Sequence, residues 1–276
     1  MKCLFILICF CLSAYCSLQG KIIETQNFAE IIRHVDADTL VILDIDDTLL
    51  IPVQTLGTDV WFISRRNHYF KTINDSSLAL DKALAEWEAV RHITKVSIVE
   101  EGTQEIIGKM QRNHIFIMGL TTQGLALATR TIMQLRSLDI DVSKTAPSHQ
   151  DHYFMNGQNG VLYREGILFT SGTPKGEALF KLCDMINYHP KHIVFINDKK
   201  THLEDVEKCA ISRNVDFTGL RYSYSDQRVA NYRQEIADLQ WSHSTFDRII
   251  SDEEAISLLE IMHTKNSDQI GVKILN

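Results

Sequence analysis

The sequence predicts an α/β protein with a doubly wound, mainly parallel sheet. Short apolar runs typical of buried strands alternate along the chain with longer stretches that have helical periodicity. Three of these runs, at 40–43, 114–118 and 192–196, are followed closely by Asp, Asn or Thr residues. Open parallel sheets bind ligands at the carboxyl ends of their strands, so this pattern also indicates where a site would lie.

The first 16 residues are expected to be a secretory signal peptide. Lys2 precedes an apolar run at 3–12 that is too short to cross a bilayer, and small residues suited to cleavage follow it. No later run reaches membrane length, so we expect no membrane segment after cleavage. Removing Lys2 changes the net charge from −7 to −8, a mildly acidic balance that argues against a nucleic-acid partner.

The remaining elements follow from local patterns. Helices are predicted at 27–35, 76–93, 101–112, 124–138, 174–187, 201–212, 226–240 and 253–263. Strands are predicted at 40–44, 114–118, 192–196 and 215–222, with a hairpin formed by 161–163 and 167–169. Ser76 or Ser77 is the expected cap of the second helix. Pro174 is expected to open the helix at 174–187, with Thr173 as its cap.

The stretch from about 50 to 110 is too long for a single crossover between parallel strands. We therefore expect a helical cap, residues 51–110, inserted into a core formed by 17–50 and 111–276. Aromatic and basic side chains gather within it at 59–69. They either contact a substrate or form a packed aromatic pair with a solvated basic face.

Two carboxylates end the first predicted strand. Asp44 and Asp46 are two residues apart, so on an extended chain they begin on the same face. Two neighbouring carboxylates repel each other unless a cation or a shared proton lies between them. In such a pair, one carboxylate serves as a nucleophile while the other moves protons.

Three further residues complete the candidate site. Thr121 follows the strand at 114–118 and offers a hydroxyl to a phosphate oxygen. Lys175 lies in the first turn of a helix, where a cation is unfavourable unless an anion binds. Asp198 follows the strand at 192–196, and with Asp44 and Asp46 it forms an all-oxygen site suited to Mg²⁺. Taken singly, each residue also has a simpler interpretation, with Thr121 as a turn residue, Lys175 as a solvated helix residue and Asp198 as a helix cap.

In these features the chain resembles the haloacid dehalogenase-like (HAD) hydrolase superfamily. The resemblance covers about residues 25–225 and rests on four motifs, which are Asp44-x-Asp46-x-Thr48, Thr121, Pro174-Lys175-Gly176 and Asn197-Asp198. The sequence around Thr121 and Lys175 is most similar to an uncharacterised secreted bacterial branch. The first motif also resembles that of secreted bacterial acid phosphatases.

The resemblance implies a capped Rossmann-like core and a mechanism. Asp44 attacks phosphorus to form an aspartyl-phosphate, and Asp46 acts as general acid and then base. Mg²⁺ is held by Asp44, the backbone carbonyl of Asp46, and Asp198. Thr121 and Lys175 stabilise the phosphoryl oxygens.

We therefore expect a secreted or periplasmic, Mg²⁺-dependent phosphatase that acts on a small phosphorylated substrate. Two alternatives remain open, namely a phosphotransferase with the same intermediate and a non-catalytic binding or effector module on the same scaffold. The chain departs from the superfamily pattern at Asn197, His202 and Gln123, and the first two of these departures keep the second alternative open. The sequence leaves the oligomeric state undetermined.

Four of the six cysteines lie in the predicted signal peptide, and Cys183 and Cys209 remain. The superfamily's strand order places their two helices on the same face of the sheet. We hypothesise a disulfide between them, with two free thiols as the alternative.

Overall fold

The computed structural model describes residues 20–245 and 248–273, with side chains as far as residue 264. The predicted signal peptide, residues 1–16, lies outside the described residues. Within the described part of the chain, no helix combines the length and the hydrophobicity needed to cross a bilayer.

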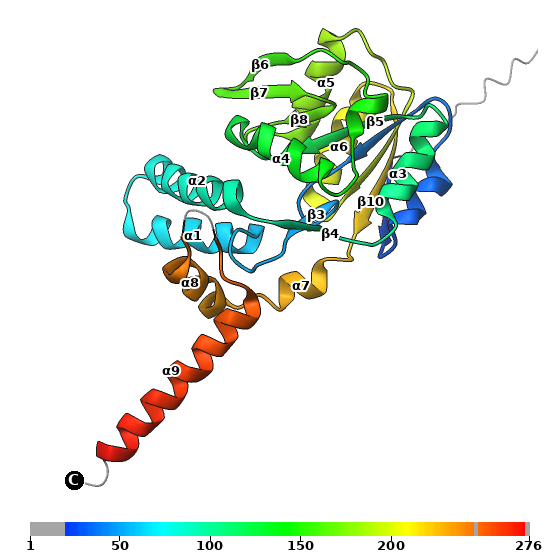
Figure 1. Ribbon diagram of the computed structural model, residues 1–276. Coiled ribbons are helices and arrows are strands. Elements are labelled where there is room, and N and C mark those ends of the chain that lie inside the picture. The colour runs from blue at the N-terminus through cyan, green and yellow to red at the C-terminus, as the bar shows by residue number, and fades with distance from the viewer. Residues whose placement is uncertain (1–19, 246–247, 274–276) are drawn as a thin grey trace, which may run out of the picture.

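The described residues form a central eight-stranded sheet in the order β1-β10-β9-β2-β5-β8-β7-β6 (Figure 1). Its strands are β1 (Gly20–Thr25), β2 (Thr39–Leu43), β5 (Phe116–Thr121), β6 (His152–Asn156), β7 (Asn159–Arg164), β8 (Ile167–Phe169), β9 (His192–Asn197) and β10 (Asp216–Tyr222). The strands from β1 to β8 in this order pair in parallel, and β7 pairs antiparallel with β8 and β6. The protein therefore has a mostly parallel, doubly wound α/β sheet, as the sequence predicts.

Helices cover both faces of this sheet. The short helix η1 (Phe28–His34), α3 (Thr103–Arg112) and α4 (Ala128–Arg136) pack on one face, and α5 (Lys175–Met185) and α6 (Lys200–Ser212) pack on the other. Strand β2 contributes to both cores because successive side chains of a strand point to opposite faces. Val41 and Leu43 join the first core, whereas Leu40 and Ile42 join the second.

Two helices stand apart from the sheet. Helices α1 (Asp59–Thr72) and α2 (Ser76–Ile93) pack against each other in the connection between β2 and β5 (Figure 1). Two short strands at their base, β3 (Leu50–Pro52) and β4 (Val96–Ile98), pair antiparallel, which the sequence did not predict. Trp61 and Trp87 share a small core with Ala237 of α8 (Gln234–His243). The division of the chain into a core and a cap stays a prediction.

Three expectations about helix ends were wrong. Asp75 caps α2, because its side chain accepts from the backbone N–H groups of Ser77 and Leu78. Thr173 does not cap α5, because its hydroxyl donates to the carbonyl of Thr170. The predicted helix at 226–240 is two helices, α7 (Asp226–Ala230) and α8, and the break lets Tyr232 pack against the core of α1 and α2.

The last helix, α9 (Asp252–Lys273), begins at an anchored residue. The Asp252 carboxylate accepts from the backbone N–H and the hydroxyl of Thr55, at 3.1 and 3.0 Å. From there the helix runs away from the rest of the molecule (Figure 1).

The hypothesis of a Cys183–Cys209 disulfide is wrong, because both thiols are free. Both helices do lie on one face of the sheet, but the cysteines sit at different heights along them. Cys209 lies opposite Gly176, where an added Cβ would come within 2.7 Å of its Sγ atom. Cys183 is two turns further along α5, about 10 Å away at ~1.5 Å per residue.

Candidate active site

The predicted site residues lie along the carboxyl edge of the central sheet. Asp44 follows β2 directly, Thr121 is the last residue of β5, and Asp198 follows β9. These three strands are adjacent and parallel, so their carboxyl ends reach the same edge. Lys175 is the first residue of α5, and its side chain reaches the same edge.

Asp44 and Lys175 form a buried ion pair. The Lys175 Nζ atom donates to the Asp44 Oδ1 atom at 2.5 Å, and their side chains are only 1% and 7% exposed. The ammonium also lies 5.5 Å from the centroid of the Phe195 ring. A charge-assisted hydrogen bond between two buried groups offsets part of the desolvation of both. The predicted nucleophile is therefore held beside a cation.

Asp46 has entirely different partners. Its Oδ1 atom accepts from Arg91 Nη1 and its Oδ2 atom from Gln123 Nε2, both at 2.7 Å. Burial raises the pKa of Asp46, although Arg91 and Gln123 each act to lower it. A carboxyl that retains its proton to higher pH suits the role of general acid.

Gln123 is fixed by a second hydrogen bond. The Thr131 hydroxyl of α4 donates to its Oε1 atom at 2.5 Å, so the amide nitrogen points to Asp46. Gln123 is one of the predicted departures from the superfamily pattern. In this protein it holds one oxygen of the Asp46 carboxyl, and Arg91 of α2 holds the other.

Arg91 was missed as a site residue. Its side chain is 1% exposed, although it lies in the helical insertion, far from the motifs in sequence. One signal was available, because Arg91 follows Trp87 by four residues and Ala83 by eight, on the buried face of α2. An arginine on an apolar helix face indicates a buried anionic partner.

Thr121 is buried, and its hydroxyl oxygen accepts from the backbone N–H of Gln123 at 3.2 Å. This bond uses the oxygen as acceptor and leaves the hydroxyl hydrogen for another partner. The arrangement is compatible with donation to a phosphoryl oxygen.

Asp198 carries an oxygen without a partner. Its backbone N–H donates to the Thr48 hydroxyl at 3.2 Å, which explains the threonine of the first motif. Its Oδ1 atom is buried and has no hydrogen-bond partner among the described residues. Burial, and then the negative charge of Asp44, raise the pKa of Asp198 to about 9.

These groups fit a magnesium ion. Within the described residues, no three His, Cys, Asp or Glu side chains are grouped to hold a metal. The predicted ligands are instead two carboxylates, Asp44 and Asp198, and the carbonyl of Asp46. Mg²⁺ commonly binds through one or two carboxylates and keeps several waters. A cation beside Asp198 would also satisfy its unpartnered oxygen and favour its charged form.

The two other departures from the superfamily pattern are Asn197, whose side chain fixes the next loop, and His202, whose ring is buried near the candidate site. The Asn197 Oδ1 atom accepts from the backbone N–H of Lys199 at 2.7 Å. Burial, followed by the positive charge of Lys175, lowers the pKa of His202 to about 4. The His202 ring is therefore uncharged at neutral pH and adds no positive charge beside the predicted metal ligands.

A second ion pair joins the insertion to the sheet edge. The Lys199 ammonium binds the Asp59 carboxylate in the first turn of α1. With the Arg91–Asp46 pair, it ties both α1 and α2 to the loops that carry the predicted site. The basic side chain of Arg65 on α1 instead pairs with Glu86 of α2, which favours a structural role for it.

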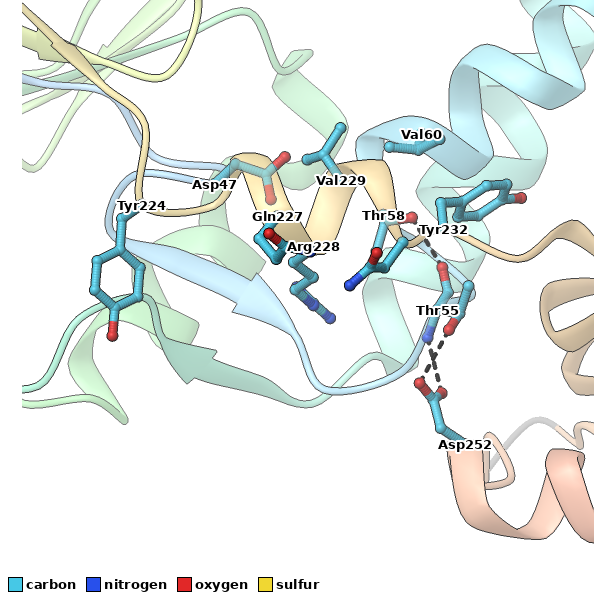
Figure 2. Close-up of a pocket in the computed structure, with 11 residues that line it drawn as sticks. Asp47, Thr55, Thr58, Val60, Tyr224, Gln227, Arg228, Val229, Tyr232 and Asp252 are labelled. Atoms are coloured by element: carbon cyan, nitrogen blue, oxygen red, sulfur yellow. Dashed lines mark hydrogen bonds between the residues drawn. The ribbon is translucent and has the colours of Figure 1, made fainter. Parts of the chain in front are cut away.

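A cavity of about 450 Å³ lies next to Asp47 of the first motif (Figure 2). It is lined by side chains from the segment before α1, from α7 and from the start of α9, among them Asp47, Thr55, Arg228 and Asp252. None of the five predicted site residues is among the described residues that line it. Asp47, whose pKa is raised to about 7 mainly by burial, connects the cavity to the first motif.

Comparisons with known proteins give related sequences and distant folds. A Chlamydia pneumoniae protein described as "Putative outer membrane protein" is 23% identical over 272 residues, covering 95% of this chain and 98% of its own. A Rickettsia prowazekii protein described as uncharacterised is 23% identical over 231 residues, covering 80% and 82%. A solved structure described as a phospho-aspartyl intermediate analogue of phosphoserine phosphatase is 12% identical to this chain, with a TM-score of 0.32. The match covers 70% of this chain and 98% of that one.

One family matches most of the chain, over residues 24–256, and this range contains every residue of the candidate site. The chain therefore belongs to the family described as "Protein of unknown function (DUF2608)".

Proposed function

We propose that this protein is a Mg²⁺-dependent phosphatase that hydrolyses a small phosphomonoester. The observation that carries the proposal is the group of side chains at one sheet edge. It consists of a buried carboxylate paired with a lysine, a threonine hydroxyl, and an aspartate oxygen without a partner. Transfer of a phosphoryl group to a carboxylate requires a nucleophile and hydrogen-bond donors held together in a site that is shielded from water.

The reaction proceeds in two steps. Asp44 attacks phosphorus, the ester P–O bond breaks, and Asp46 gives its proton to the leaving oxygen. Water then attacks the aspartyl-phosphate while Asp46 takes one of its protons, which releases phosphate and restores Asp44. In both steps Lys175 and Thr121 donate to the phosphoryl oxygens. When bound by Asp44, Asp198 and the Asp46 carbonyl, Mg²⁺ supplies positive charge against those oxygens.

We also propose that the protein acts outside the cytoplasm. The predicted signal peptide, residues 1–16, supports export. The description of the Chlamydia pneumoniae relative as an outer membrane protein supports the same proposal.

The test is hydrolysis of 4-nitrophenyl phosphate by residues 17–276, which include every residue that the structure describes. We expect turnover that requires Mg²⁺, stops with a chelator and is lost in Asp44→Asn. Activity that survives Asp44→Asn would contradict the proposal. Adding a simple alcohol tests the phosphotransferase alternative, because transfer would yield a new alkyl phosphate in place of inorganic phosphate.

A further inference from the structure

The Arg91 side chain is buried with most of its hydrogen-bonding capacity unused. Its Nη1 atom donates to Asp46, whereas its Nε and Nη2 atoms are buried and have no partner among the described residues. The Trp87 ring lies 5.3 Å from the guanidinium carbon. A ring face stabilises the positive charge but accepts no conventional hydrogen bond from the edge of the group.

Such an arrangement is costly unless a ligand completes it. A buried guanidinium has five N–H groups, and buried polar groups in folded proteins are nearly always paired. The second oxygen of Asp46 accepts from Gln123, so this carboxyl offers the arginine only one of its two oxygens. The guanidinium is suited to bind a second anion in a forked, two-bond geometry.

The position of Arg91 indicates which part of a substrate it meets. In the proposed reaction Lys175 and Thr121 hold the phosphoryl group, and Asp46 touches the leaving oxygen. Arg91 is hydrogen-bonded to Asp46, so it lies on the leaving-group side. Along the path from the leaving oxygen through Asp46, the Arg91 guanidinium is two hydrogen bonds away, ~6 Å, so a group that it binds lies close to the ester oxygen of a small substrate.

We propose that Arg91 binds a second anionic group on the substrate, and that the substrates are small phosphomonoesters with a carboxylate or second phosphate close to the ester oxygen. This inference rests on the proposed phosphatase function. Arg91 acts here as a specificity-determining residue contributed by the helical insertion.

The first test compares matched substrates with the wild-type chain. Carboxymethyl phosphate and ethyl phosphate differ only by a carboxylate in place of a methyl group. Ethylene glycol bisphosphate and 2-hydroxyethyl phosphate form the corresponding pair for a second phosphate. We expect kcat/KM to favour the doubly anionic member of at least one pair by about 10-fold or more, because a hydrogen bond between two charged groups is stronger than one between neutral groups. Equal kcat/KM in both pairs would overturn the inference.

The variants separate recognition from positioning. Arg91→Met should reduce the preference within the favoured pair to near unity, and Arg91→Lys should retain part of it through its point charge. Arg65→Met removes an arginine of the same insertion that pairs with Glu86, and it should keep the full preference. If Arg91→Met lowers both members of the pair by the same factor, Arg91 only positions Asp46, and the inference fails. If this variant does not fold, Arg91→Lys and the wild-type ratios decide.

A binding measurement keeps the inference separate from the proposed function. 3-Phosphonopropionate and propylphosphonate mimic the carboxylate pair but cannot be hydrolysed, and calorimetry with wild-type protein gives their Kd values in the presence of Mg²⁺. Where the kinetic preference is for the carboxylate, we expect about 10-fold tighter binding of 3-phosphonopropionate. Tighter binding without any turnover would leave the inference standing and remove the phosphatase proposal. Turnover with no preference in kcat/KM or in Kd would leave the phosphatase proposal standing and overturn the inference.

Discussion

At the residue scale, the Asp46 carboxyl is held from two sides by groups from different parts of the chain. Gln123 follows β5, and Arg91 ends the buried face of α2. Asp44 and Asp46 were expected to share a face, but β2 ends at Leu43, before either of them. Beyond that point the chain turns, and Asp47 has a positive φ of 58°. The alternation of side chains along a strand no longer applies there.

Thr131→Val tests the support of Gln123. The substitution keeps the shape of the side chain but leaves the Gln123 amide oxygen buried without a donor. We expect a loss of about 1–3 kcal/mol in the free energy of unfolding. The Gln123 hydrogen bond lowers the pKa of Asp46, so a loosened amide should move that pKa upward in the pH profile of kcat/KM. Thr131→Ser keeps the hydroxyl and should preserve the profile; an unchanged profile in Thr131→Val would contradict this account.

At the element scale, the N-terminus of α2 depends on one side chain. The Asp75 carboxylate accepts two backbone N–H bonds, at 2.9 and 3.1 Å. Asp75→Ala should therefore lower the free energy of unfolding by about 1 kcal/mol, measured by urea denaturation. Ser76→Ala is the control and should change it by less than about 0.5 kcal/mol. Equal losses in the two variants would restore serine as the cap.

The contact between α5 and α6 depends on a glycine next to Lys175. A Cβ on Gly176 would lie 2.7 Å from the Asp205 carbonyl oxygen and from the Cys209 Sγ atom. Gly176→Ala should cost about 1–3 kcal/mol, because the helices must separate, and kcat should fall as Lys175 moves.

Gly108 in α3 provides the matched control for Gly176. Its added Cβ would meet only the end of the Arg112 side chain, at 3.3 Å. Gly108→Ala should stabilise the protein by up to about 1 kcal/mol through helix propensity. Thermal unfolding of both variants measures the difference, and a Gly176→Ala variant as stable as Gly108→Ala would show that the helices are not tightly packed there.

At the scale of the whole molecule, the sheet edge and the insertion bring together more carboxyls than cations. The carboxyls are those of Asp44, Asp46, Asp47, Asp59 and Asp198, and the cations are Arg91, Lys175, Lys199 and, beside Asp47, Arg228. The raised pKa values of Asp47 and Asp198 follow from burial in this acidic group. A divalent cation would reduce the excess negative charge.

Stability should consequently depend on pH and Mg²⁺ together. Asp47 and Asp198, whose folded-state pKa values are raised, hold more protons in the native protein than in the unfolded chain from about pH 4 up to about pH 7 and pH 9, respectively. His202, whose folded-state pKa is lowered to about 4, offsets one of these two protons below about pH 6.5. The metal-free protein should therefore lose stability as pH rises through this range. Mg²⁺ binds the deprotonated carboxylates, so its stabilising effect should grow with pH.

Thermal unfolding at pH 5, 7 and 9, with Mg²⁺ or with a chelator, measures this dependence. Asp198→Asn should remove most of the difference between the two conditions. A Tm that does not respond to Mg²⁺ at pH 9 in the wild-type protein would argue against a magnesium site at this edge.

The sequence by itself determined the fold class and the sheet edge at which the candidate residues lie. Apolar runs at 40–43 and 192–196 form β2 and β9, and the residues that follow such runs in a parallel sheet must share one edge. Asp44, Lys175 and Asp198 were placed at this edge in this way, because each lies at the end or the start of an element with a clear local pattern.

Only the tertiary structure decided which groups meet. Arg91 lies 45 residues from Asp46 in sequence, and Gln123 lies 77 residues away. Strand β1 is defined by its pairing with β10 near the other end of the chain. Cys183 and Cys209 lie about two turns apart along the packed helices α5 and α6, and strand order alone does not show this offset. Local patterns fix helices and strands, whereas these contacts depend on how distant segments pack, and no local pattern encodes that packing.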